Sequence, residues 1–354
     1  MQTQTRKLFN KVREAVAHDN GVEDVAEKFT VSPSVEQRLT EQMTESADLL
    51  SKINIIGVTE QKGQKLGIGV GNPIASRTDT KDEERETAYV GEVNPDDYEC
   101  MQTNFDTHLD YRVMDAWAIA KPRGTDPVGT FGVLYRKATL KRMALDRIMT
   151  GWNGTHAAKK TNRATYPLLQ DVNAGWLEKV RANAPQRFMG YDSTGQATSD
   201  VYQIGEGGTY QTLDAAVFDV MASLLDAWHV GSDDLVLMLG RELWVNHGLN
   251  LYNDSRAATE RNALQTWFAT QAIAGLPTIC PPFFPQRGLV VTSYDNLSIY
   301  YQTGGVRRAI IDNPKRDRVE EYLSSNDAYV VEDYGKFAAM RSSAIQLKHN
   351  GAWV

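Results

Sequence analysis

The residue types that catalytic sites use are present in this sequence, but we find none of them at a catalytic spacing. Gly67-Ile68-Gly69-Val70-Gly71 begins like a dinucleotide-binding turn. However, Asn72 stands where that fingerprint needs its third glycine, and no helix is expected after it. Asp233 and Asp234 are adjacent, so on a strand they would point to opposite faces, which favours a cap over a metal pair. The chain also lacks the phosphate-binding loop, the paired histidines of zinc proteases and the GxSxG turn of hydrolases.

Histidine and cysteine are too scattered to form a metal centre or a disulfide framework. The six histidines stand singly, and Cys100 and Cys280 are the two cysteines of the chain. We therefore expect no cofactor and no metal, and we predict that the protein is not an enzyme. A soluble α/β enzyme with an unrecognised site is the alternative from a different class, and it would require convergent acids or histidines in a concave pocket.

Length and charge narrow the remaining classes of protein. The chain has 354 residues, of which 42% are hydrophobic, enough for the packed core of one or two domains. Lys and Arg number 38 against 45 Asp and Glu, and the net charge of −7 argues against a general nucleic-acid binder. No signal-peptide core and no stretch of ~20 apolar residues occurs, so we expect synthesis in a cytoplasm and no membrane contact.

The first 52 residues are predicted to form an arm with little core of its own. Residues 1–31 hold five acids and five bases, and their apolar residues form only a thin helical stripe that begins at Leu8. Such a segment is suited to docking on a partner. Ser34 is expected to cap a second helix that continues to the end of the arm.

Residues 53–125 are predicted to form a long hairpin together with the strands at its base. Ile53–Val58 is expected to be a strand, and Tyr98–Trp117 to be the returning strand. The region between them has almost nothing apolar to bury, so it should project into solvent or onto another molecule. The charged residues of this hairpin are the expected contact residues: Lys62, Lys65, Asp79, Lys81, Asp82, Glu83, Glu84, Arg85 and Glu86.

Helices and strands are predicted to alternate over the rest of the chain. The longest helix falls within residues 126–153, in a region that extends to residue 189, and an α/β unit follows over 190–285. Basic clusters are candidate contacts with acidic surface on another subunit or, weakly, with packed nucleic acid: Arg136, Lys137, Lys141, Arg142, Arg307, Arg308, Lys315 and Arg316.

The last part of the chain, residues 286–354, is predicted to be rich in strands. The pattern over Leu289–Gln302 predicts a hairpin that turns around residues 294–296. Arg318–Leu323 and Ala328–Arg341 alternate in hydrophobicity and are predicted to be two edge-like strands.

Several segments taken together resemble the major capsid protein of P-two-like (peduovirus-type) tailed bacteriophages. They stand in the order of that family over residues 28–335. The resemblance implies the α+β capsid fold of the Hong Kong 97 type. The segments that carry it are Lys28–Val35, Met43–Ile55, Lys62–Val70, Tyr98–Cys100, Asn104–Asp106, Leu145–Gly154, Leu169–Lys179, Asn296–Tyr301, Asn313–Glu320 and Tyr329–Tyr334.

The resemblance assigns a role in a shell to each region. Residues 1–52 would be the N-terminal arm, and 53–125 the extended hairpin loop over a neighbouring subunit, with strands of the peripheral domain. Residues 126–189 would be the spine helix and peripheral domain, and 190–285 the axial domain round a hexamer or pentamer axis. Residues 286–354 would return to the peripheral sheet and end in a tail.

The resemblance also implies processing and partners. A maturation protease would remove about residues 1–31, with cleavage near Thr30, Val31 and Ser32. The partners would be copies of the chain itself, in hexamers and pentamers of an icosahedral head, an internal scaffold and protease protein, the portal protein, and weakly bound double-stranded DNA. The protein would reside in the virion of a tailed phage or prophage after assembly in the host cytoplasm. An encapsulin-like bacterial nanocompartment is the alternative within the same fold, marked by a neighbouring cargo gene in place of portal and terminase genes.

Overall fold

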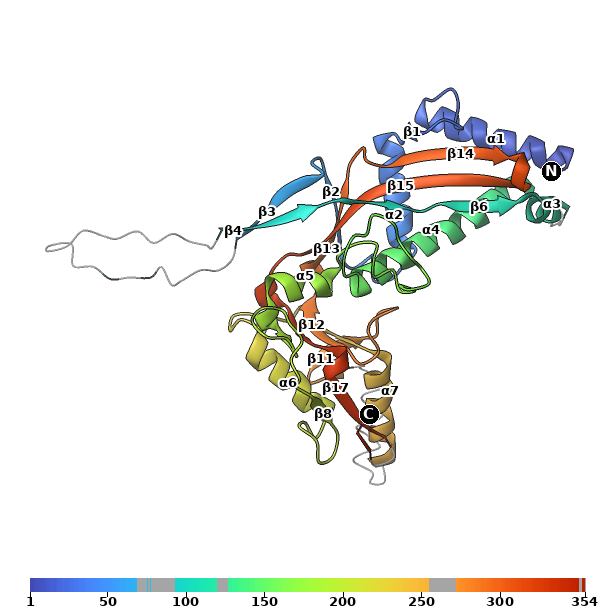
Figure 1. Ribbon diagram of the computed structural model, residues 1–354. Coiled ribbons are helices and arrows are strands. Elements are labelled where there is room, and N and C mark those ends of the chain that lie inside the picture. Colours follow the sequence, from blue (N-terminus) through green and yellow to red (C-terminus); the bar gives the residue numbers. More distant parts are fainter. Residues whose placement is uncertain are drawn as a thin grey trace.

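The structure, a computed structural model, describes residues 1–68, 75, 77, 93–119, 127–254, 272–349 and 352–353. Its fold is α+β, as predicted, with a long body from which a two-stranded hairpin projects at one side (Figure 1). The α-helices of these residues are α1 (Thr3–Asn20), α2 (Pro33–Glu45), α3 (Tyr111–Ile119), α4 (Pro127–Asn153), α5 (Trp176–Asn183), α6 (Leu213–Leu224) and α7 (Arg241–Asp254). Short 3-10 turns follow Ala184, Ser293, Asn313, Asp333 and Arg341.

Two of the predicted helices, α4 and α2, can be compared with the structure. The predicted longest helix is α4, whose 27 residues give a rod of about 40 Å. The second arm helix, α2, is shorter than predicted and does not begin after Ser34. Ser32 is its N-cap residue and Pro33 its first helical residue, because proline needs no amide partner there and its fixed φ suits the first turn.

A seven-stranded sheet forms the upper part of the body in Figure 1. Its centre is β15 (Arg318–Val331), which pairs along one edge with β14 (Arg307–Asn313) and then β13 (Leu297–Gln302). On its other edge β15 pairs with β5 (Met101–Asn104) and β6 (Thr107–Asp110). The sheet ends with β2 (Asn54–Val58), parallel to β13, and with β1 (Phe29–Thr30), antiparallel to β14.

The prediction of two edge-like strands over Arg318–Leu323 and Ala328–Arg341 is wrong. Residues 318–331 form one continuous strand that is paired on both sides. The second predicted segment is interrupted after Val331, and its residues 338–340 form a strand of a different sheet. The alternating pattern correctly predicted a strand, but it contained no information on how many neighbouring strands would pair with it. Those neighbours come from residues 101–110 and 297–313.

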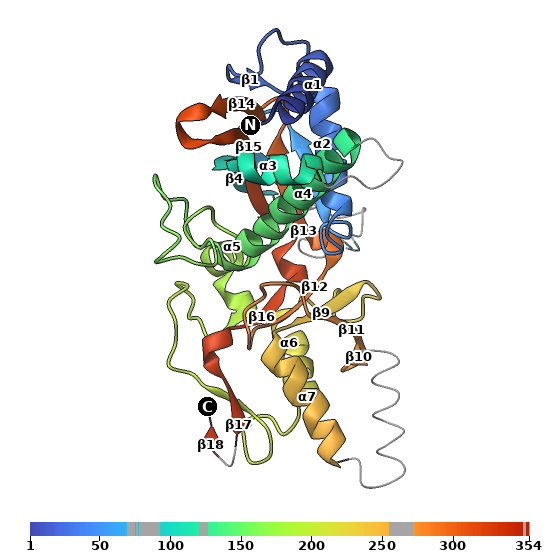
Figure 2. The same cartoon turned by 90° about the vertical axis from the view of Figure 1, so that its right-hand side faces the viewer.

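The lower part of the body contains a six-stranded and a three-stranded sheet. Figures 1 and 2 show α6 and α7 on opposite sides of these strands. The six-stranded sheet has the order β10 (Ala272–Ile273), β11 (Leu276–Ile279), β9 (Leu235–Leu239), β12 (Leu289–Ser293), β16 (Ala338–Met340) and β7 (Phe188–Met189). The three-stranded sheet has the order β18 (Ala352–Trp353), β17 (Ile345–His349) and β8 (Tyr202–Ile204).

The predicted hairpin over Leu289–Gln302 does not exist, because its two strands lie in different sheets. β12 pairs with β9 and β16 in the lower part, whereas β13 pairs with β15 and β2 in the upper part. The turn between them is therefore a crossing point between the two parts of the body. The region expected to return to the peripheral sheet, 286–354, sends only β13, β14 and β15 to the upper sheet.

The projecting hairpin consists of β3 (Lys62–Ile68) and β4 (Val93–Glu99), which pair over their full lengths. The hairpin differs from the predicted one, because its first strand is β3 and not residues 53–58, which belong to the upper sheet as β2. Of the predicted returning strand over Tyr98–Trp117, only residues 98–99 belong to the hairpin. β5 and β6 pair with β15, and residues 111–119 are helix α3. Tyr111 and Met114 lie one turn apart on α3 and are both buried, so the helical spacing places two apolar side chains on one face.

The two largest hydrophobic clusters of the described residues lie in the body, and the larger one joins α4 and α5 to the upper sheet. Trp176 of α5 contacts Trp152 of α4 edge-on, with ring centroids 4.9 Å apart, and Tyr329 of β15 at 5.4 Å. Gly151 permits this approach, because a Cβ atom there would lie 2.3 Å from the Trp176 ring. The second core lies beneath α6 and contains the buried strand β9.

Substitution of Gly151 should disturb the first core. We expect Gly151→Ala to lower the free energy of unfolding by about 1–3 kcal/mol, because the added methyl group overlaps a ring that is fully buried. Urea denaturation of the unassembled chain would measure this. Gly231→Ala is the matched control, since a Cβ atom at Gly231 would meet nothing within 4 Å. Equal destabilisation by both substitutions would contradict the packing argument.

Candidate inter-subunit surfaces

The N-terminal segment lies on its own chain and not on a separate partner, although the sequence suggested the latter. The backbone N–H of Gln2 and the hydroxyl of Thr5 donate to Asp115 of α3, at 3.0 and 2.5 Å. These bonds, the Thr5 bond foremost, lower the pKa of the Asp115 carboxyl. The apolar stripe of the segment is covered by the body. The buried cluster contains Phe9, Val16, Val25, Tyr111, Met114, Ile310 and Val319.

Asp312 of β14 forms a second polar attachment for this segment. Arg6 of α1 forms an ion pair with Asp312, and the phenol of Tyr111 donates a hydrogen bond to the same carboxylate. Burial, followed by the bond to Asp312, raises the pKa of Tyr111 to about 12, so the phenol stays protonated and remains a donor. The backbone N–H of Ile310 donates to the carbonyl of Val25 at 2.8 Å.

The predicted processing residues lie in a paired and partly buried stretch. Thr30 belongs to β1 and is opposite Arg307 of β14. Val31 is 1% exposed, and its N–H donates to the carbonyl of Val306 at 3.0 Å. The N–H of Ser32 donates to Asn20 at 3.1 Å. A protease that binds its substrate as an extended strand therefore needs this stretch to leave β14 first.

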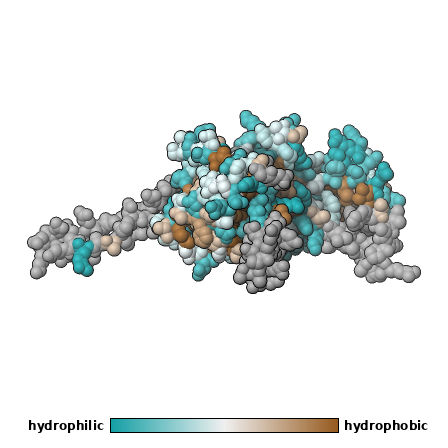
Figure 3. Space-filling model, turned by 90° about the horizontal axis from the view of Figure 1, so that it is seen from below, coloured by the Kyte–Doolittle hydropathy of each residue, from teal (hydrophilic) through white to brown (hydrophobic). Residues whose placement is uncertain are grey.

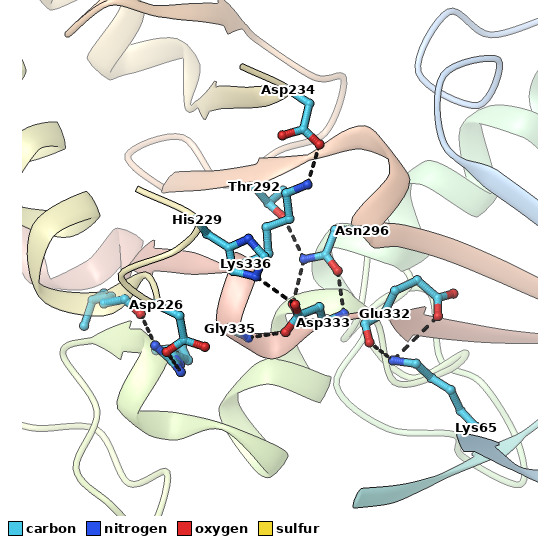
Figure 4. Close-up of polar contacts among 12 residues, drawn as sticks. Lys65, Asp226, His229, Asp234, Thr292, Asn296, Glu332, Asp333, Gly335 and Lys336 are labelled. Carbon is cyan, nitrogen blue, oxygen red and sulfur yellow. Dashed lines mark hydrogen bonds and ion pairs between the residues drawn. The ribbon is translucent and has the colours of Figure 1, made fainter. Parts of the chain in front are cut away.

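The root of the hairpin is anchored by Lys65. Its ammonium group donates to the carbonyls of Val331, at 2.6 Å, and Glu332, and lies 3.6 Å from the Glu332 carboxylate (Figure 4). The Lys65 side chain is only 9% exposed. Lys62 differs, because its side chain is exposed. Its ammonium nitrogen lies 3.7 Å from the Glu99 carboxylate, a weak ion pair on the surface. The other predicted hairpin residues, Asp79, Lys81, Asp82, Glu83, Glu84, Arg85 and Glu86, lie outside the described residues.

The same region connects the upper and lower parts of the body. Asn296 donates to Thr292 and to the carbonyl of Asp333, and accepts from the N–H of Asp333 at 2.6 Å. Asp333 also contacts His229, at 3.0 Å, from the segment that follows α6 (Figure 4). Lys336 forms an ion pair with Asp234, and this hydrogen bond lowers the pKa of the Asp234 carboxyl. Asp234 therefore binds a lysine of its own chain, and the described residues contain no group of three or more His, Cys, Asp or Glu side chains that could hold a metal ion.

The predicted basic contact residues do not form one surface. Arg142 pairs with Asp146, and Arg308 pairs with Glu321 at 2.6 Å, so these two are engaged within the chain. Arg136 lies near Arg308, and partial burial, together with that like charge, lowers the pKa of its guanidinium. The remaining candidates are exposed: Lys137, Lys141, Arg307, Lys315 and Arg316.

Exposed apolar side chains gather on the lower part of the body. Figure 3 views the molecule from below and shows brown apolar patches within a mostly teal and white surface. Phe218 of α6 is 56% exposed and Trp228 is 53% exposed, while Leu249 of α7 is 54% exposed. Half of the large exposed apolar residues in the described part of the chain lie here: Val201, Phe218, Trp228, Val230, Val245 and Leu249. No sequence motif marks these residues, because each occupies an otherwise ordinary amphipathic helix or loop.

The fold and these surfaces define a capsid subunit of the Hong Kong 97 type. The structure is similar to a chain of the satellite phage P4 procapsid that includes the size determination (Sid) protein, with a TM-score of 0.77 and 38% identity. The match covers 99% of this chain and 100% of that chain. A chain of the capsid of an empty GTA particle shares the fold, with a TM-score of 0.50 and 14% identity, over 83% of this chain and 89% of that chain.

Sequence comparisons identify the family. Residues 8–342 match the family described as phage major capsid protein, P2 family. The capsid proteins of Escherichia phage P2 are 42% identical, over 94% of this chain and 93% of theirs. The major capsid protein of Serratia phage KSP20 is 39% identical, over 99% of this chain and 100% of its own length. The chain therefore belongs to the P2 family of phage major capsid proteins.

Membership in this family answers the main functional question. The protein is a structural component of a phage virion that assembles with copies of itself into the icosahedral head, and it is not an enzyme. The resemblance drawn from the sequence motifs is confirmed. No helix among the described residues is long and apolar enough to span a membrane.

Loss of the Lys65 ammonium group should loosen the hairpin. We expect Lys65→Met to lower the free energy of unfolding by about 1–3 kcal/mol, because two carbonyls and a half-buried carboxylate lose their donor. Hydrogen exchange in β3 and β4 should also become faster. Lys62→Met is the control on the same strand, and its exposed pair predicts a change below about 0.5 kcal/mol. Unchanged exchange in Lys65→Met would contradict the anchoring role.

Proposed function

We propose that this major capsid protein forms the hexamers and pentamers of a head that encloses double-stranded DNA, with its projecting hairpin lying over the neighbouring subunit. The observation that carries this proposal is that β3 and β4 pair apart from the larger sheets, although Lys65 binds their root to Val331 and Glu332. They form a two-stranded sheet of their own. A lone two-stranded hairpin is marginally stable in water, so it gains most from contact with another molecule. A neighbouring copy of the chain is the partner that self-assembly supplies.

We further propose that the lower part of the body is the axial domain, which contains residues 190–285 together with the later strands β12, β16, β17 and β18. Its α6 and α7 lie on opposite sides of the strands (Figure 1), and each helix contains a large exposed apolar residue, Phe218 in α6 and Leu249 in α7. A ring of identical subunits requires two different patches that meet head to tail. Contact between the α6 side of one copy and the α7 side of the next satisfies that requirement.

Polar substitution of these two patches should impair ring formation. We expect Phe218→Ser and Leu249→Ser each to reduce the yield of shells, because burial of a large apolar side chain contributes about 1.5–3 kcal/mol per contact. Both side chains are exposed in the single chain, so its melting temperature should change little. Val12→Ser, at an exposed position of α1, is the control. Velocity sedimentation would measure the yield of shells. An equal yield in all three variants would contradict the axial contact.

The N-terminal segment is proposed to be removed during maturation near Thr30, Val31 and Ser32, after it has left β14. The described contacts support an order of events, since these residues are paired or buried while the segment is docked. The protease and internal scaffold protein, and the portal protein, are proposed partners. DNA is proposed to contact exposed basic side chains such as Lys137 and Lys141 only weakly, because the chain as a whole is acidic.

The processing proposal predicts a change in the mass of the subunit. Mass spectrometry of purified virions should find chains that begin near residue 32, whereas unassembled chain should resist cleavage there. Weakening of the docked segment by Asp115→Ala should make the Thr30–Ser32 stretch more sensitive to added protease, because Gln2 and Thr5 lose their acceptor. Virions in which most copies keep Met1 would contradict the proposal.

A further inference from the structure

A basic loop lies between α4 and α5, outside the proposed hairpin and axial contacts. Residues 155–170 contain three bases and no acid, and Lys159, Lys160 and Arg163 are all exposed. Asp171, 2% exposed, fixes the loop from below. Its carboxylate accepts the N–H of Asn162 at 2.6 Å, and its carbonyl accepts the N–H of Ala158 at 2.9 Å.

A cavity of about 310 Å³ opens beneath these cations. Lys159, Lys160 and Arg163 line it from the loop, and Arg147 lines it from α4. Arg147 is 5% exposed, and although two of its nitrogens bind Asp327, its Nη1 has no hydrogen-bond partner among the described residues. Asp146 is the one acid in the described lining, and it pairs with Arg142. The lining therefore has a surplus of positive charge and a buried donor that lacks an acceptor.

We propose that this basic loop and cavity receive carboxylates from the hairpin of a neighbouring copy of the chain. Residues 79–86 hold five acids and two bases, a net charge of −3, which matches the three cations of the loop. Figure 1 shows β3 and β4 leading away from the body. Self-assembly supplies a second copy of the chain, and the proposal takes that copy as the source of the acids.

The chemistry of the loop favours carboxylates of a protein over the phosphates of DNA. The three cations lie in one short loop and line one cavity, a compact site that suits a short acidic segment of protein. The two aromatic rings of the loop, His156 and Tyr166, contact each other edge-on and are not arranged as a stacking platform. The inference rests on the proposed function, because it names the surface on which the proposed hairpin contact is made.

Charge exchange between the two segments tests the proposal. The loop variant Lys159→Glu/Lys160→Glu and the hairpin variant Asp82→Lys/Glu83→Lys should each reduce shell yield about tenfold at physiological ionic strength, because like charges then face each other. The variant that carries all four substitutions should recover most of the yield. Lys7→Glu/Lys11→Glu changes the net charge equally at two exposed positions of α1 and should assemble normally. Velocity sedimentation and electron microscopy would measure the shells.

The possible outcomes separate this inference from the proposal on which it rests. Normal assembly of the loop variant, failure of the combined variant to recover, or an equal loss in the α1 control would each overturn the basic loop as the receiving surface. Shells of the loop variant that form normally but hold less DNA would overturn it in favour of nucleic acid. Normal assembly of the hairpin variant would instead overturn the proposed hairpin contact. An unchanged melting temperature of each unassembled variant would show that a folding defect does not cause the loss of shells.

Discussion

The pairing of β15 on both of its edges is the constraint on which the rest of the structure depends. β14 lies on one edge and carries the N-terminal segment through β1. β5 lies on the other edge and continues directly from β4 of the hairpin. The residues that follow Val331 lead into the lower part of the body. A single strand thus sets the positions of the arm, the hairpin and the lower sheets relative to one another.

Buried polar contacts fix helix α4 to β15 in addition to the apolar packing between them. Arg147 of α4 binds Asp327 of β15 through two nitrogens at 2.9 Å, and Tyr329 donates to the carbonyl of Arg147 at 3.0 Å. Both charged groups are almost fully buried, so removal of either would leave an uncompensated charge. A subunit held this firmly transmits each weak contact of its projections to the whole body. Many such contacts together make a stable shell from individually reversible ones.

Local features of the fold could be predicted from the sequence, and long-range pairing could not. Helix α4 and the projecting hairpin follow from periodicity and composition over short windows. Leu289–Gln302 shows the limit of this approach. The turn signals around Asn296 are local, but its side chain binds Asp333, and the strands on either side join different sheets. Such pairing is set by residues far along the chain, which no short window contains.

For the candidate contact residues, too, the sequence indicated local properties but not the long-range partners. Lys62 is exposed on the hairpin, as its surroundings in the sequence predict, but Lys65, three residues later, is bound to Val331 and Glu332. Arg142 and Arg308 looked like free surface bases and are paired with acids of their own chain. The exposed apolar residues of α6 and α7 could be recognised only after folding had shown which faces remain uncovered.

The central claim is that the projections of a firmly held body make the contacts between neighbouring subunits of the head. Electron cryomicroscopy of assembled shells, at a resolution that traces side chains, tests it most directly. The account predicts that the hairpin of each subunit crosses onto the next, with residues 79–86 against the loop 155–170 of that neighbour, and that α6 faces α7 round the capsomer axis. A hairpin folded back on its own subunit, with residues 79–86 distant from every neighbouring body, would contradict it.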